Sequence, residues 1–148
     1  MSELNDLYRE LIIDHSKRPR NFSRLADPKR TAQGYNPLCG DRITLDLKVE
    51  DNHIEQIGFQ GSGCAISTAS ASLMSESVKG KTLEEAEALM NKFHSLITTD
   101  KPAEAGLGKL AVFSGVREFP ARVKCATLAW HTLKSALNGA VAEPVTTE

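Results

Sequence analysis

Four side chains in this sequence have types and positions suited to binding a metal ion. Cys39 and Asp41 lie in the stretch NPLCGDRI and are separated only by Gly40, a residue that lets the backbone approach closely. A thiolate and a carboxylate on one turn can point at the same atom, and both are ligands for zinc or iron. Together with Cys64 and Cys125 they make four ligands. That number closes a tetrahedral zinc site or holds part of an iron–sulfur cluster.

The surroundings of Cys64 favour a functional thiolate. It lies in GSGCAIS, where Gly61 and Gly63 flank Ser62, and the small residues that follow it predict a helix. The unpaired N–H groups and the positive end of a helix stabilise a negative charge at that position. A cysteine that only fills a core would be expected within an apolar run.

The surroundings of Cys125 are less specific. It lies in PARVKCATLAW, where the cations of Arg122 and Lys124 favour a thiolate, but its apolar neighbours would also suit a buried core position. The sequence has no paired C-x-x-C motif. From spacing alone, three thiols that pack as small hydrophobic groups are therefore an open alternative to a metal site.

The predicted elements bring the first two cysteines together. Apolar residues at helical spacing predict an N-terminal helix that ends before Arg18, and a long polar loop is expected to lead to Cys39. Alternating apolar residues predict a strand over 43–49, and 53–60 is expected to return beside it as a hairpin. A hairpin returns the chain to its starting end, so Cys39 and Cys64 should lie close together.

Helices are expected to follow the hairpin. We predict one helix after Cys64, one that opens with a capping box at Thr82, a short one over 110–116, and a final one over 120–137. The fold class is therefore predicted as α+β: a small antiparallel sheet packed against helices, with an N-terminal helix and a long C-terminal helix.

Length and composition set limits on function. The 148 residues, 41% of them hydrophobic and 25% charged, predict one globular domain over 1–148. A formal net charge of -1 argues against a nucleic-acid partner. We expect no membrane partner and a cytoplasmic location, since no apolar run approaches the length of a membrane span and the N-terminus is unlike a signal peptide.

Three motifs in order resemble those of the IscU-like iron–sulfur cluster assembly family: NPLCGD, GSGCAIS and VKCATLAW. The resemblance covers essentially the whole chain and is closest to the SufU branch. The interval of 61 positions between Cys64 and Cys125 is longer than in IscU scaffolds, which predicts an insertion at about 92–112. Lys124 stands where those scaffolds carry histidine, and EFPAR stands where they carry the chaperone-docking motif LPPVK.

The resemblance implies a fold, a cofactor and partners. It implies a SufE/IscU-like fold and a zinc ion held by Cys39, Asp41, Cys64 and Cys125. Cys39 would accept persulfide sulfur from a SufS-type, pyridoxal-phosphate-dependent cysteine desulfurase, whose histidine would take the zinc position that Cys39 vacates. The sulfur would then pass to a downstream iron–sulfur assembly scaffold.

The resemblance and the local sequence also name residues that would support the site. These are the two glycines beside the ligands and two basic residues near the third cysteine: Gly40, Gly63, Arg122 and Lys124.

Two other functions use the same residues. The first is an IscU-like scaffold that assembles a 2Fe–2S cluster on the four ligands, since zinc and cluster ligands are of the same types. The second is a non-catalytic zinc module for protein interaction, since a closed four-ligand site is usually structural. Whether the protein is an enzyme, as a zinc-dependent sulfurtransferase, depends on which of these functions it has.

Overall fold

The computed structural model describes residues 2–37, 39–99, 106–138 and 145–146. Its elements in chain order are α1 (Ser2–Lys17), β1 (Arg30–Asn36), β2 (Asp41–Glu50), β3 (His53–Ser62), α2 (Ala65–Val78), α3 (Leu83–Thr98), the 3-10 helix η1 (Gly108–Glu118), α4 (Pro120–Leu137) and β4 (Val145–Thr146). The predicted α+β class is confirmed.

The sheet has the strand order β3-β2-β1-β4. β2 pairs antiparallel with both β1 and β3, whereas the short β4 runs parallel to β1. The predicted hairpin is confirmed. Both strands extend two residues beyond 43–49 and 53–60 at the open end, and β2 extends one residue further at the turn.

The prediction of a long loop up to Cys39 is wrong, because β1 occupies its second half. The strand alternates as expected, but its inward residues are Ala32, Gly34 and Asn36. None of them is strongly apolar, so the period-two signal is absent from the sequence. Gly34 is required by packing: a Cβ there would lie 2.1 Å from the Oγ1 of Thr132 in α4.

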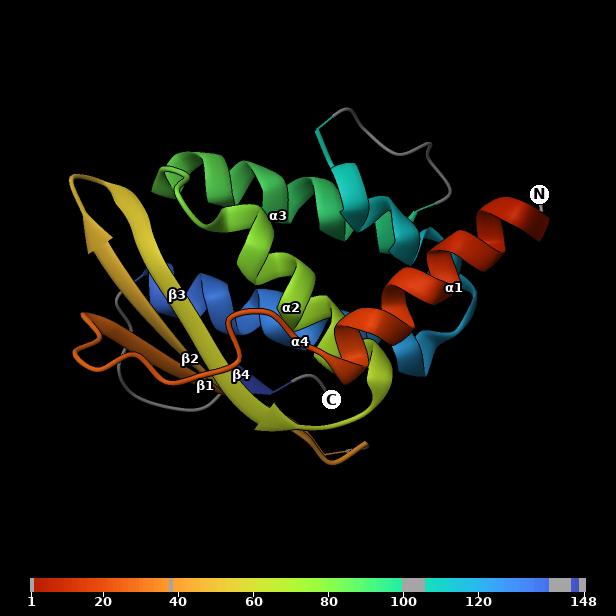
Figure 1. Ribbon diagram of the computed structural model, residues 1–148, viewed down its shortest axis with the longest axis horizontal. Helices are drawn as coiled ribbons and strands as arrows, with labels where there is room; N and C mark the ends of the chain where they lie inside the picture. Colours follow the sequence, from red (N-terminus) through yellow and green to blue (C-terminus); the bar gives the residue numbers. More distant parts are fainter. Residues whose placement is uncertain (1, 38, 100–105, 139–144, 147–148) are drawn as a thin grey trace.

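The helices form layers on one side of the sheet (Figure 1). α4 packs on β1 and β2, and α2 contacts β3 and α4. α1 then packs on α2, while α3 and η1 pack on α4. The buried apolar residues form one cluster, in which Phe93 stacks on Trp130 and meets Phe113 edge to face. No helix of the described ranges has the length and apolarity that a bilayer crossing requires.

The predicted helix boundaries match closely after the hairpin. Thr82 and Glu85 form the expected capping box of α3, and α4 has the predicted bounds with Pro120 in its first turn. The short helix predicted over 110–116 is the longer 3-10 helix η1. The segment 92–112, where an insertion is predicted, comprises the end of α3 and the start of η1, with residues 100–105 outside the described ranges.

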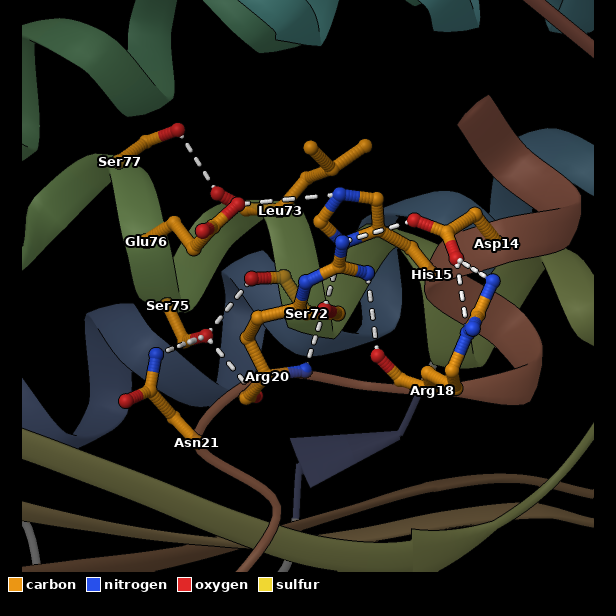
Figure 2. A network of polar contacts seen from close by, with 10 residues as sticks. All are labelled: Asp14, His15, Arg18, Arg20, Asn21, Ser72, Leu73, Ser75, Glu76 and Ser77. Atoms are coloured by element: carbon orange, nitrogen blue, oxygen red, sulfur yellow. Dashed lines mark hydrogen bonds and ion pairs between the residues drawn. The ribbon is translucent and has the colours of Figure 1, made fainter. Parts of the chain in front are cut away.

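A polar network fastens the end of α1 and the chain after it to α2 (Figure 2). The Nδ1 of the buried His15 lies 2.7 Å from the Oγ of Ser72, and the backbone N–H of Arg20 donates to the same hydroxyl at 2.8 Å. The amide of Asn21 donates to the Oγ of Ser75 at 2.9 Å. The tautomer of the His15 ring decides whether Ser72 donates to Nδ1 or accepts from it.

The Nε2 of His15 is buried and has no hydrogen-bond partner among the described residues. Burial, followed by the charge of Arg20, lowers the pKa of His15 below its ordinary value of 6.5. The other charged groups that act on the ring are Glu76 and Asp14, which oppose the shift, and Lys109, which adds to it. The Oε1 of Glu76 is 3.7 Å from Nε2 of His15.

Acid should therefore weaken the fold through His15. The unfolded chain binds a proton on this ring at a higher pH than the folded chain does, so the free energy of unfolding should fall as the pH drops through 6.5. His15→Leu should lower stability at every pH and reduce this slope. Urea denaturation of both proteins between pH 7.5 and 5, at equal metal loading, measures the difference. Equal slopes would show that His15 is not the group responsible; His131, whose pKa burial also lowers, is present in both proteins.

Candidate metal centre

The turn between β1 and β2 carries Cys39 and places Asp41 in the sheet. Asn36 pairs with Asp41 across the hairpin, and the carbonyl of Asn36 accepts hydrogen bonds from the N–H of Cys39 at 3.3 Å and of Gly40 at 2.8 Å. Gly40 has φ of 72°, a left-handed conformation that favours glycine. Cys39 is consequently exposed on the turn, whereas Asp41 is fully buried as the first residue of β2.

The hairpin of β2 and β3 brings Cys64 to Asp41. Pairing of Arg42 with Ser62 returns the chain to the start of β2. The backbone N–H of Cys64 then donates to Oδ1 of Asp41 at 2.8 Å, and its Sγ lies 3.8 Å from Oδ2. Gly63 makes this approach possible, since a Cβ there would lie 2.5 Å from Oδ1 of Asp41.

Cys64 is the N-cap residue of α2, as the sequence predicts. Its sulfur accepts a hydrogen bond from the N–H of Ser67 at 3.4 Å. The thiol therefore lies at the end of the helix where backbone donors are unpaired.

Cys125 reaches the same point from α4. Its Sγ lies 3.4 Å from the Sγ of Cys39 and 3.8 Å from the side-chain amide nitrogen of Asn36, which donates to it. The ligand atoms of Cys39, Asp41 and Cys125 lie within 4.8 Å of one another. Three of the four predicted ligands thus converge directly, and Cys64 joins them through its contacts with Asp41.

A second contact fixes the position of Cys125 relative to α2. The hydroxyl of Ser70 in α2 donates to the carbonyl of Ala126 at 2.6 Å and accepts from Nε1 of Trp130 at 3.2 Å. All three residues are buried. The helix that starts at Cys64 is therefore tied to the residue that follows Cys125.

Burial controls the electrostatics of Cys125, which is only 3% exposed. It raises the pKa of this thiol well above its ordinary value, and the contacts with Asp41, Cys39 and Cys64 raise it further. The interpretation that Arg122 and Lys124 favour the thiolate of Cys125 is therefore outweighed by desolvation.

The two basic residues lie apart from the sulfur atoms. Arg122 is exposed, and its guanidinium lies over the ring of Phe119, 4.6 Å from the centroid. Lys124 is half-buried. In the described part of the chain neither side chain makes a hydrogen bond or ion pair with a thiol, so their supporting role stays a prediction.

The donor set fits a metal ion. Sulfurs bound to one tetrahedral zinc at about 2.3 Å lie about 3.8 Å apart, close to the 3.4 Å between Cys39 and Cys125. A fully buried carboxylate normally has a cationic partner. None of the ion pairs among the described residues involves Asp41. A cation among Cys39, Asp41, Cys64 and Cys125 would supply this charge.

The sequence motifs do not indicate that Asn36 belongs to the site. Asn36 is fully buried, closes the turn through its carbonyl and donates to Cys125 through its amide. The available signal was the Asn36-Pro37 dipeptide, which favours a turn. It gives no indication that the amide points inward.

Comparison with known proteins identifies the family. Residues 7–138 match the NifU-like N terminal domain. The chain belongs to this family. The resemblance to IscU and SufU proteins that the three cysteine motifs suggest is confirmed by relatives that extend over nearly the whole NifU-like domain.

These relatives have two kinds of name. The domain is 46% identical to the iron–sulfur cluster assembly scaffold protein IscU of Streptococcus pyogenes, over 93% of this chain and 86% of that protein. It is 41% identical to the zinc-dependent sulfurtransferase SufU of Bacillus subtilis, over 90% of each chain. The crystal structure of FiSufU from Fervidobacterium islandicum AW-1 superposes with a TM-score of 0.83 at 36% identity, covering 86% of this chain and 94% of that one.

Proposed function

We propose that this NifU-like domain accepts sulfur from a cysteine desulfurase as a persulfide on Cys39, at a site that holds zinc through Cys39, Asp41, Cys64 and Cys125. The observation that carries the proposal is how differently the four ligands are held. Asp41 and Cys125 are buried, and the exposed Cys64 is fixed as the N-cap of α2, whereas Cys39 is exposed on a turn. Such a site can release the Cys39 thiol to a partner and retain the other three ligands.

The proposed transfer is a thiol–disulfide exchange. The Cys39 thiolate attacks the outer sulfur of the desulfurase persulfide, forming a new S–S bond on Cys39. The S–S bond of the donor breaks, and the desulfurase cysteine leaves as a thiolate with the electron pair. No external oxidant or reductant is required.

Each residue has a separate part in this reaction. When bound, zinc supplies a positive charge that keeps its cysteine ligands deprotonated at neutral pH. Cys39 is the ligand best placed to leave, because the left-handed Gly40 and an exposed turn surround it. Asp41 and Cys125 are held by hydrogen bonds from Cys64 and Asn36 respectively, and so remain in place.

The main competing function is a scaffold for a 2Fe–2S cluster, and the IscU relative at 46% identity carries that name. Two features of this chain favour sulfur transfer instead. Lys124 stands where the IscU scaffolds that this chain resembles carry histidine, and 61 positions separate Cys64 from Cys125. The predicted insertion at 92–112 would account for this longer interval.

The deciding experiment compares sulfur and metal on the same purified protein. A SufS-type cysteine desulfurase and cysteine are added, and mass spectrometry then measures the persulfide on each cysteine alongside zinc content. We expect one zinc ion per chain and sulfur on Cys39. Anaerobic addition of iron and sulfide should give no stable visible absorption of a 2Fe–2S cluster; a stable spectrum without persulfide would favour the scaffold. Zinc loss that unfolds a protein unable to accept sulfur would favour a structural zinc module.

A further inference from the structure

An apolar groove lies beside the thiol site, between α1, η1 and the start of α4. Its volume is about 310 Å³, and its main apolar lining residues are Ile12, Ile13, Ile66, Val112, Val116 and Phe119. Two of these are unusually accessible for large apolar side chains, with Ile13 41% and Phe119 47% exposed. Exposed apolar surface gathered in a concave site is typical of protein interaction sites.

The charged groups of the groove have one sign. Arg9 on α1 and Arg122 on α4 are among its lining residues, and no lining residue in the described part of the chain is acidic. The guanidinium of Arg122 lies over the Phe119 ring, so its charge is presented at the apolar surface. The complementary ligand is an apolar protein segment that carries carboxylates.

Two lining residues of the groove lie on the same helices as two of the thiols, and close to them along the chain. Ile66 lies two residues after Cys64, in the first turn of α2, and Arg122 lies one helical turn before Cys125. The α1 wall is held in place by the contacts of His15, Arg20 and Asn21 with α2. A partner segment in the groove would therefore lie at a fixed position relative to the thiols.

We infer that this groove binds an apolar, carboxylate-bearing segment of the sulfur-donating desulfurase, and so positions the donor persulfide at Cys39. The inference rests on the proposed function. Most of the specificity should come from the apolar contacts at Ile13 and Phe119, with Arg9 steering association of the acidic segment.

Two groove variants and a matched control test the inference. Ile13→Asp and Arg9→Glu should each raise the Kd for the desulfurase about tenfold or more. Both substitutions add a negative charge where the partner segment carries carboxylates. Lys79→Glu makes the same charge reversal on an exposed residue at the far end of α2 and should leave the Kd within about twofold. Zinc content and the rate of Cys39 alkylation by iodoacetamide should match wild type in all three proteins.

The outcomes separate the groove from the proposed function. If wild type accepts persulfide but the groove variants bind the desulfurase as tightly as wild type, the groove inference is wrong and the function stands. If wild type accepts no persulfide, the proposed function is wrong. A photo-crosslinking residue placed at Ile13 gives an independent readout. It should capture a desulfurase peptide containing Asp or Glu; capture of a basic peptide or of a second copy of this chain would overturn the inference.

Discussion

Cys39→Ala is expected to reduce persulfide acceptance from the desulfurase to the background of the assay. The variant loses the exposed thiol on the turn, while the buried Cys125 and the exposed N-cap thiol Cys64 remain. Burial keeps Cys125 away from an incoming persulfide. Cys64 should not replace Cys39 as the acceptor either, because its hydrogen bonds with Asp41 and Ser67 hold it at the start of α2. Single-turnover transfer from a desulfurase that carries labelled persulfide, followed by mass spectrometry of the acceptor, measures the loss.

Cys125→Ala is the matched control for this prediction. It removes a ligand but leaves the thiol of Cys39, so it should lose metal and still form some persulfide on Cys39. Sulfur transfer to Cys39→Ala at the wild-type rate would exclude Cys39 as the acceptor. Loss of transfer in both variants together with loss of fold, seen by circular dichroism, would indicate that the ligands are structural.

Asp41→Ala is expected to release metal about tenfold to a hundredfold faster than wild type. Removing even an outer partner of a metal ligand typically costs this much affinity, and Asp41 is a direct candidate ligand at the centre of the cluster. The variant should still bind zinc when zinc is in excess, through the three cysteines. Chelator competition at pH 7.5 measures the dissociation rate.

Asp41→Asn separates two roles of this carboxylate. The amide oxygen can still accept from the N–H of Cys64, the 2.8 Å hydrogen bond made by Oδ1, but it carries no charge. If Asp41 binds metal, the asparagine variant should also release it faster; if the carboxylate only holds the turn, the variant should resemble wild type. Gly63→Ala provides a third test, because its Cβ would displace Oδ1 without changing any candidate ligand.

Helices and strands could be predicted wherever a local sequence pattern within the element indicated its type or its first residue. The alternation in β2, the capping box at Thr82 and Pro120 at the start of α4 are local features, and each placed its element correctly. β1 has no alternating apolar pattern, because the residues at its inward positions are small or polar and allow close packing. Gly34 belongs there only because Thr132 approaches it from α4, and that contact joins residues far apart in the sequence.

The same distinction applies to the site. Cys64 at a helix start and Asp41 at a strand start could be inferred from neighbouring residues. The contact of Cys39 with Cys125 could not, since it depends on how α4 docks on the sheet and on α2. That docking is set by Gly34 and by the hydrogen bonds of Ser70, none of which resembles a metal-binding motif.

The contact between Cys39 and Cys125 also has a consequence for how the protein is made. These residues are 86 positions apart, and ribosomes add roughly 5–20 residues per second, so about 4–17 s pass between their synthesis. During that interval the turn and the start of α2 can fold, but their two thiols lack the cysteine that completes the cluster. Newly made chains would therefore complete the four-ligand site only after α4 has docked. Until then Cys39 is exposed to any oxidant or electrophile that reaches the nascent chain.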